Sequence, residues 1–332
     1  MTSTLPRING RLPAPRGVLS SAVCEALALD PSSHVALPDA TEIDDPYSAD
    51  LQLTLYTCYE LHYRGFDGVD AEWEWQPDLL RLRRDLERKF LDYVRSEVEP
   101  GSDAVAEMDA LSVEPIDGTG PSFHLAQDGT WAQMQEYFVH RSLYHLKEAD
   151  PHAWAIPRIS GQAKASFVAV EYDEYGGGRG DRVHQQLFTN LLDAAGLDSG
   201  YLAYLDVVPA ETLATVNLMS LFGLHRSLRG ATVGHFTATE ITSSPGSRRL
   251  VQALQRMDAP APCIEFYSEH VEADAVHEQV MRHDVVGDLI AREPELESDI
   301  VFGMRAGDFV EGKLGALLLQ NWKQNASSLV AG

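Results

Sequence analysis

The residues best suited to chemistry lie in one acidic segment of the last third of the chain. His270, Asp274 and His277 are spaced i, i+4 and i+7, so on an α-helix they share an arc of about 60°. Two imidazoles and a carboxylate on one helix stripe are suitable ligands for iron, manganese or zinc. A solvated acidic helix face is the alternative interpretation, since short ligand-like patterns also arise by chance. Four further acidic residues lie close by: Glu265, Glu269, Glu272 and Glu278.

A second segment repeats part of this pattern. Glu174, Asp181 and His184 are spaced i, i+7 and i+10 and would share an arc of about 80° on a continuous helix. The spacing Asp181-x-x-His184 is the same as that of Asp274-x-x-His277. Helical bundles that bind two irons use such carboxylate-x-x-His pairs on two helices, and further carboxylates bridge the metals. Together the two segments favour a two-metal site.

Four glycines lie between Glu174 and His184, and they affect the path of the chain there. Each costs a helix interior about 1 kcal/mol relative to alanine, so we expect a local break or a widened turn. The same run could be interpreted as a phosphate-binding loop, but it lacks the Lys-Ser/Thr ending and follows no predicted strand. The glycines are Gly176, Gly177, Gly178 and Gly180.

A helix predicted over residues 131–149 offers more candidates, and spacing by itself does not choose among them. Glu148 lies beside Asp150-Pro151, so an exposed helix end is the alternative to a ligand at this position. Histidines in such a helix lie at the surface or at the edge of the core more often than they bind metal. The candidates are Glu136, His140, His145 and Glu148.

The elements that must position these side chains are predicted to be helices. Pro77 stands at a helix start, and apolar residues follow it at three- and four-residue steps as far as Tyr93, as an amphipathic helix requires. Strand-like alternation is scarce, and Ser243-Ser244-Pro245-Gly246 is predicted to be a turn. Further helices are predicted over 131–149, 160–175, 182–195, 209–228, 230–243, 264–282 and 308–324.

The sequence predicts two parts of unequal size. Residues 1–46 contain six prolines among small and polar residues, and we expect them to form a largely irregular N-terminal arm. Residues 47–332 are predicted to form one all-α domain, because their apolar period is helical almost throughout.

The charge of the chain and its apolar and cysteine content disfavour several kinds of partner and site. The chain has 50 acidic residues against 26 Lys and Arg, a formal net charge of −24, which disfavours nucleic acids and anionic membrane surfaces. It has no apolar stretch of the roughly 18 residues that cross a bilayer and no apolar signal-peptide core, so a cytoplasmic location is expected. Cys24, Cys58 and Cys263 are too few and too far apart for a disulfide framework or a cysteine-based zinc site.

At the candidate ligands the chain resembles the haem-oxygenase-like di-iron oxidase family, a group of iron-containing redox enzymes. The resemblance covers about residues 51–294. It is most specific in Leu146-Lys147-Glu148-Ala149-Asp150-Pro151, in Asp173-Glu174-Tyr175-Gly176-Gly177-Gly178 with His184, and in residues 269–277. It implies an all-α, haem-oxygenase-like multi-helix bundle without haem.

The resemblance also implies a set of ligands and cofactors. It selects Glu148 from the first core helix and implies a centre of two Fe(II) ions with dioxygen as co-substrate. Asp181 departs from the family pattern, since several relatives have Glu or no ligand at that position. The implied metal ligands are Glu148, Glu174, Asp181, His184, His270, Asp274 and His277.

The resemblance predicts an oxidase or oxygenase of a biosynthetic pathway. Members of the family cleave or desaturate carbon chains, N-oxygenate amines or close small rings, and fold does not choose among these reactions. We expect a small-molecule substrate, an amine or carboxylate such as an amino acid, and an external electron donor; a homodimer is compatible with the sequence. The alternatives are a helical iron-storage protein, and a haem-oxygenase-like or thiaminase-like enzyme, for which Cys263 would have to be the nucleophile.

Overall fold

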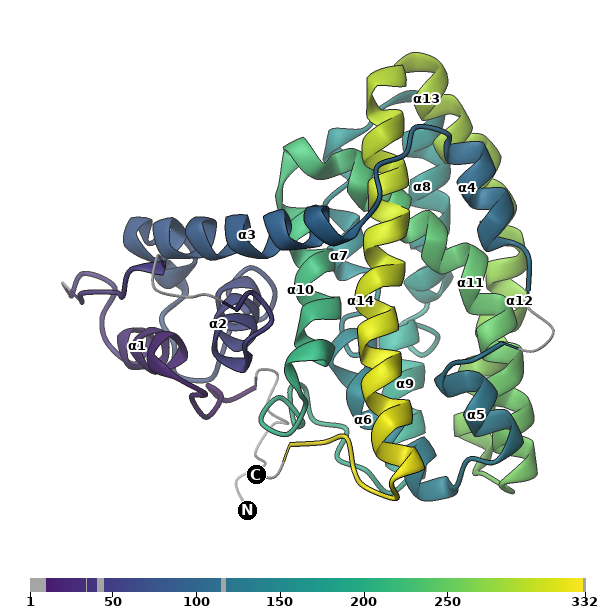
Figure 1. The fold of residues 1–332 in the computed structure, drawn as a ribbon, viewed down its shortest axis with the longest axis horizontal. Helices are drawn as coiled ribbons and strands as arrows, with labels where there is room; N and C mark the ends of the chain where they lie inside the picture. The colour runs from purple at the N-terminus through teal and green to yellow at the C-terminus, as the bar shows by residue number, and fades with distance from the viewer. Residues whose placement is uncertain (1–9, 34, 41–44, 115–117, 331–332) are drawn as a thin grey trace.

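The computed structural model of the chain describes residues 10–33, 35–40, 45–114 and 118–330, without the side chains of Glu272, Asp274 and Ala275. These residues form an all-α fold, as the sequence predicts (Figure 1). They contain no strand, and one isolated bridge joins Gly10 to Phe66. None of their helices combines the length and the apolar character that a membrane-spanning helix requires.

Three helices near the N-terminus stand beside the main bundle, at the left of Figure 1. They are α1 (Val18–Leu27), α2 (Ala49–Glu60) and α3 (Pro77–Glu97), with the 3-10 turn η2 (Ala71–Trp75) before α3. The expected irregular arm therefore contains a helix. Leu19, Val23 and Leu27 of α1 are buried against α2, and this packing outweighs the helix-breaking prolines on either side.

The main bundle is formed by the rest of the chain, with α14 at the front of the view and α12 at its right side (Figure 1). Its core lies where α11 packs along both α12 and α14. Its α-helices are α4 (Ala104–Leu111), α5 (Pro121–Gln127), α6 (Trp131–His145), α7 (Asp150–Ala153), α8 (Gly161–Glu174), α9 (His184–Ala194), α10 (Ala210–Leu224), α11 (Arg229–Arg256), α12 (Ala261–Gln279), α13 (Asp288–Arg292) and α14 (Glu297–Lys323). Shorter segments are η3 (Ile156–Arg158), η4 (Gly176–Gly178), η5 (Arg226–Leu228), η7 (Pro294–Leu296) and the π-helix η6 (Val280–Gly287).

The amphipathic helix predicted after Pro77 is confirmed in α3. The side chain of Gln76 caps its N-terminus by accepting hydrogen bonds from the backbone N–H groups of Asp78 and Leu79. The apolar side chains at three- and four-residue steps face inward, and Tyr93 is half-buried at their edge. The buried apolar residues are Leu79, Leu82, Leu86, Phe90 and Val94.

The turn predicted at Ser243–Gly246 is wrong, because α11 continues through Pro245 to Arg256. Proline in a helix interior removes one hydrogen bond and costs about 3 kcal/mol. Burial on both sides of Pro245 outweighs this cost, with Phe236 and Ile241 before it and Leu250 and Leu254 after it. A single long helix therefore replaces the predicted helix and turn.

Close contact between α11 and α14 depends on glycine. A Cβ atom on Gly234 would lie 1.9 Å from the carbonyl oxygen of Ile300, and one on Gly303 would lie 2.1 Å from that of Ala231. Only residues without a side chain allow the two backbones to approach so closely. This contact sets the position of α11, which carries one of the site residues described next.

Candidate metal centre

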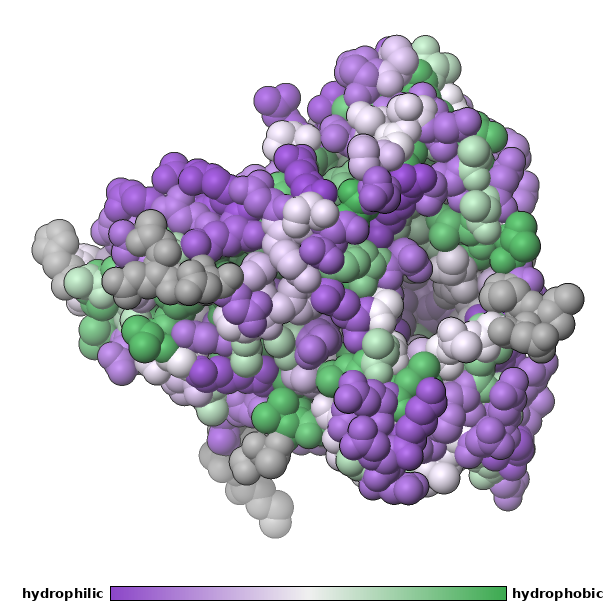
Figure 2. All heavy atoms as spheres, viewed as in Figure 1, coloured by the Kyte–Doolittle hydropathy of each residue, from purple (hydrophilic) through white to green (hydrophobic). Residues whose placement is uncertain are grey.

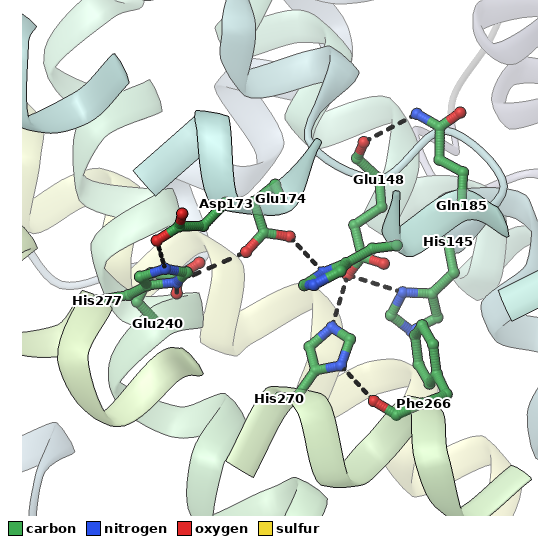
Figure 3. Close-up of polar contacts among 10 residues, drawn as sticks. His145, Glu148, Asp173, Glu174, Gln185, Glu240, Phe266, His270 and His277 are labelled. Atoms are coloured by element: carbon green, nitrogen blue, oxygen red, sulfur yellow. Dashed lines mark hydrogen bonds and ion pairs between the residues drawn. The ribbon is translucent and has the colours of Figure 1, made fainter. Parts of the chain in front are cut away.

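Carboxylates and imidazoles from five segments converge in the interior of the main bundle (Figure 3). Glu148 lies in the turn between α6 and α7, Glu174 ends α8, and His184 begins α9. Glu240 comes from the middle of α11, while His270 and His277 come from α12. All six side chains are buried.

The first group of potential ligands is Glu148, Glu174, His184 and His270, whose ligand atoms all lie within 4.8 Å of one another. Nε2 of His270 is 3.3 Å from Oε1 of Glu148, and Nδ1 of His184 is 2.7 Å from Oε2 of Glu174. Nδ1 of His270 lies 2.8 Å from the carbonyl oxygen of Phe266, to which it donates a hydrogen bond. This bond leaves the lone pair of Nε2 directed at the group, as a metal-binding histidine requires.

The second group is Glu174, Glu240 and His277. Nδ1 of His277 is 3.0 Å from Oε2 of Glu240 and 3.6 Å from Oε1 of Glu174. The other ring nitrogen, Nε2, is 3.2 Å from Oδ2 of Asp173, whose side chain is largely exposed at the edge of the site (Figure 3). One exposed carboxylate, Asp173, and two buried ones, Glu174 and Glu240, thus surround the imidazole of His277.

Glu174 belongs to both groups. Its Oε2 atom faces His184 and its Oε1 atom faces His277, so the two oxygens of one carboxylate point to different groups. A carboxylate that offers one oxygen to each of two positions is the bridging arrangement of two-metal carboxylate sites.

A tight turn between α8 and α9 brings Glu174 and His184 together. Gly176 has φ +70°, and a Cβ atom there would lie 2.6 Å from the backbone of Arg182 and Val183. Only glycine combines the left-handed conformation with so close an approach. The break expected from the glycines is confirmed: α8 ends at Glu174 and α9 begins at His184.

The turn that carries Glu148 is also held in place by its neighbours. The side-chain amide of Gln185 donates to the carbonyl oxygen of Glu148 at 3.1 Å and to Oδ1 of Asp150 at 3.2 Å. Ala149 adopts φ +70°, an unusual conformation for a residue with a side chain. These contacts turn the Glu148 side chain toward the helices instead of leaving it at an exposed helix end.

The side chains present fit bound metal, because several buried polar atoms lack hydrogen-bond partners. Among the described residues, Oε2 of Glu148 and Nδ1 of His184 make no hydrogen bond, although Nδ1 lies 2.7 Å from Glu174. Two atoms that bind one transition-metal ion at about 2.0–2.2 Å lie about 3 Å apart without pointing at each other. Buried polar atoms left in this state cost free energy, and a metal ion would remove that cost.

Neighbouring charges shift the pKa values of the titrating groups in the site. Burial by itself would raise the pKa of Glu148, but His145 and His270 beside it hold the pKa well below its usual range. Burial lowers the pKa of His184, and the nearby Glu174 carboxylate outweighs it and raises the pKa. Without metal, therefore, the Glu174 carboxylate favours the protonated form of His184.

The structure places the seven predicted site residues in three ways. It brings together five of them, Glu148, Glu174, His184, His270 and His277. It does not bring Asp181 to the groups: the side chain is 72% exposed and pairs with Arg179 at 3.0 Å, because the turn after Gly178 directs it outward. Asp274 lies on α12, but its side chain is outside the part that the structure describes.

Sequence reasoning missed Glu240 as a potential ligand, because a lone acid on α11 shows no spacing to other ligands. Its buried place in a run of small and apolar residues was the available signal. His145 was also passed over, although its Nδ1 atom lies 3.0 Å from Oε1 of Glu148. The rejected candidate Glu136 accepts hydrogen bonds from Trp322 and Ser328 instead.

Cys263 does not have the surroundings of a nucleophile. Its thiol is buried and donates to the carbonyl oxygen of Leu191 at 3.6 Å. Burial raises the pKa of this thiol to about 11, so it stays protonated near neutral pH. The structure offers no support for a thiaminase-like role of this residue.

A cavity of about 330 Å³ reaches the first group from one side. His145, Glu148 and His270 form part of its wall, and so do Tyr137 and Tyr267. A volume of this size suits a small organic molecule. The arrangement therefore combines a potential two-metal centre with adjoining space for a substrate.

Comparison with known proteins gives two findings. A family described as iron-containing redox enzymes matches residues 135–311, a range that includes every residue of both groups. A nitrosourea synthase of Streptomyces achromogenes subsp. streptozoticus is 24% identical over 217 residues, which cover 63% of this chain and 46% of that protein. The chain thus matches less than half the length of this curated relative.

Proposed function

The chain belongs to the iron-containing redox enzyme family, and from this premise we propose that it is a dioxygen-dependent oxidoreductase with two non-haem irons. The substrate would be a small amine or carboxylate, and the setting a biosynthetic pathway. The observation that carries the proposal is the sharing of Glu174 between two buried carboxylate–histidine groups.

The two groups divide the ligands between two metal positions. Glu148, His184 and His270 would hold one ion, Glu240 and His277 would hold the other, and Glu174 would bridge them. Mixed carboxylate and imidazole ligands suit iron, and bound iron would supply the binding and reduction of dioxygen. The hydrogen bond from His270 to the Phe266 carbonyl keeps that ring in the ligand orientation.

The remaining residues of the site would orient the substrate and exclude water. Phe266 and Tyr267 of α12 and Met304 of α14 contribute apolar surface to the wall of the cavity. The similarity to a nitrosourea synthase supports a nitrogen compound as the substrate, which favours the amine of the two classes. We propose an external electron donor as the source of the electrons that the reduction of dioxygen requires.

The proposal is tested by reconstituting the purified chain with ferrous iron under anaerobic conditions. We expect two irons per chain, a Mössbauer spectrum of coupled high-spin sites after oxidation, and no Soret band. One tightly bound iron per chain, or a haem spectrum, would overturn the di-iron proposal. A variant that removes a distant exposed charge, Asp193→Asn, should retain two irons.

A second measurement separates an oxidase from an iron-storage protein. Candidate small amines added to the iron-loaded chain should accelerate dioxygen consumption in an oxygen electrode. In a storage protein the rate would follow the iron supplied and would be indifferent to every added amine.

A further inference from the structure

The cavity beside the first group has a second end, which opens to the surface between α11 and α14. Figure 2 shows the molecule hollowed there, to the right of α14 and above α5. At the inner end are His145, Glu148 and His270, whereas Asp308 and Glu311 of α14 belong to the same wall. A molecule in this cavity therefore has the metal groups on one side and α14 on another.

Not every charged side chain on the cavity wall has a partner of opposite charge. Each arginine of the wall already has an acidic partner: Arg141 forms a bidentate pair with Glu311, at 2.8 and 2.7 Å, and Arg249 pairs with Glu114. Asp308 lies one helical turn before Glu311 and has no hydrogen bond or ion pair among the described residues. The wall therefore carries one carboxylate that no protein cation neutralises.

Buried polar side chains of the cavity point to a ligand independently of this charge. Tyr267 is 3% exposed and lines the cavity, yet its hydroxyl has no hydrogen-bond partner in the part of the chain that the structure describes. His235 is 4% exposed, and its Nδ1 atom lies 3.1 Å from Nε2 of His152. Burial lowers the pKa of His235 to about 4, so the ring is neutral and adds no positive charge to the wall.

We propose that this cavity binds a small organic cation, an ammonium or guanidinium compound, whose charged group pairs with Asp308 and the adjoining oxygen of Glu311. The identification of the ligand as the substrate rests on the proposed function. Asp308 supplies the free charge, and Glu311 remains able to accept a second hydrogen bond while Arg141 holds it. The hydroxyl of Tyr267 would accept a hydrogen bond from the part of the ligand nearer the metal groups.

The same charges would exclude anions. A carboxylate of equal size would meet Asp308 and Glu311 as like charges, and both arginines of the wall are already paired, Arg141 with Glu311 and Arg249 with Glu114. Asp308 would therefore be a residue that determines specificity, and it lies outside the metal-binding groups.

The test is calorimetric titration of the intact chain, with and without ferrous iron, using four probes of similar length. The probes are n-pentylammonium, n-butylguanidinium, hexanoate and 1-hexanol. We expect one cation per chain, bound about tenfold or more tightly than 1-hexanol, and weaker binding still for hexanoate. Equal binding of the four probes, or preference for hexanoate, would overturn the proposal.

A pair of matched variants locates the binding. Asp308→Asn keeps the shape of the side chain and removes its charge, and we expect it to weaken binding of both cations about tenfold while leaving 1-hexanol unchanged. Asp193→Asn removes the same charge from the exposed face of α9 and controls for the attraction of cations to a chain of net charge −24. Equal effects of the two variants would show that the cations bind without using the cavity.

The test of the cation site can fail or succeed independently of the test of the di-iron centre. Binding is measured without turnover, so a chain that selects cations but binds fewer than two irons would contradict only the di-iron centre. Asp308→Asn should also retain the iron content of the original chain. Two irons with no selection for cations would contradict only the cation site.

Discussion

Glu174 belongs to both groups of potential ligands. Its two oxygens face different histidines, so replacing it removes a ligand from both proposed metal positions. Glu240 and His277, in contrast, belong to one group only. This difference makes the shared carboxylate testable by counting metal ions.

We expect Glu174→Ala to lower iron content at both positions, to well below one iron per chain, whereas His277→Ala should leave about one. Iron would be counted per folded chain by mass spectrometry, with circular dichroism as the measure of folding. His140→Ala is the matched control, because this buried histidine bonds Thr212 and Ser328 away from the site. If Glu174→Ala keeps one firmly bound iron, the carboxylate does not bridge.

Asp181, unlike Glu174, is expected to be dispensable for iron binding. Its side chain is exposed and paired with Arg179, so we expect Asp181→Asn to retain both irons and full dioxygen consumption. Surface pairs of this kind contribute little to stability, so the free energy of unfolding should barely change. Loss of one iron in Asp181→Asn, with Asp181→Glu unaffected, would instead show that the residue reaches the metal.

Among the elements, the turn from α8 to α9 has the greatest effect on the site. It reverses the chain within nine residues between Glu174 and His184 and still brings their side chains to 2.7 Å. Three consecutive glycines with positive φ make this turn, and Gly176 also lies against the backbone of Arg182 and Val183.

We expect Gly176→Ala to destabilise the chain by about 1–3 kcal/mol and to weaken iron binding, because strain in the turn moves the start of α9. Gly180→Ala is the control, since a Cβ atom there meets nothing within 4 Å and its φ is not in the left-handed region. Urea unfolding and iron titration of both variants provide the measurement. Equal behaviour of the two would show that the turn tolerates a side chain.

At the scale of the whole molecule, a buried ion pair connects α2 to the turn that carries Glu148. Nζ of Lys147 lies 2.6 Å from Oε2 of Glu60 on α2, and both side chains are completely buried. Lys147 precedes Glu148 directly, so this pair connects α2 to the site. Breaking a buried ion pair by removing one partner typically costs about 3–5 kcal/mol of folding stability. Helix α2 is therefore an integral part of the fold.

The buried charges also predict how the stability of the iron-free chain depends on pH. Burial lowers the pKa of His277, but Glu240 outweighs this effect and raises the pKa to about 9. Since an unfolded histidine titrates near 6.5, the protonated ring stabilises the folded chain fully below pH 6.5, and this contribution is lost as the pH rises through 9. Burial, with Glu174 and Glu240 nearby, raises the pKa of Glu171 to about 9 and acts in the same direction.

We therefore expect the free energy of unfolding of the iron-free chain to fall between pH 7 and 8.5. Histidines whose pKa values are lowered, such as His152 and His235, act below pH 6.5 and do not oppose this trend. Urea unfolding at several pH values would measure it, and His277→Gln should flatten the slope. A stability that is constant or rises over this range would contradict the pKa shifts.

The sequence by itself predicted the helical class and five of the six residues that the structure groups together. Periodic apolar residues after Pro77 predict α3, and the spacing of His270 and His277 places both on one face of α12, because helix geometry relates residues three to eight positions apart. The glycines after Glu174 predict the break there for an equally local reason. Within one element, spacing is sufficient.

Only the tertiary structure decided which residues from different elements meet. Glu240 joins the site because α11 packs along α12, which carries His277, and Asp181 leaves it because the turn after Gly178 directs it outward. The continuation of α11 through Pro245 likewise depends on burial against neighbouring helices. Such outcomes depend on packing between distant segments, which overrides local preference by several kcal/mol and leaves no spacing pattern in the sequence.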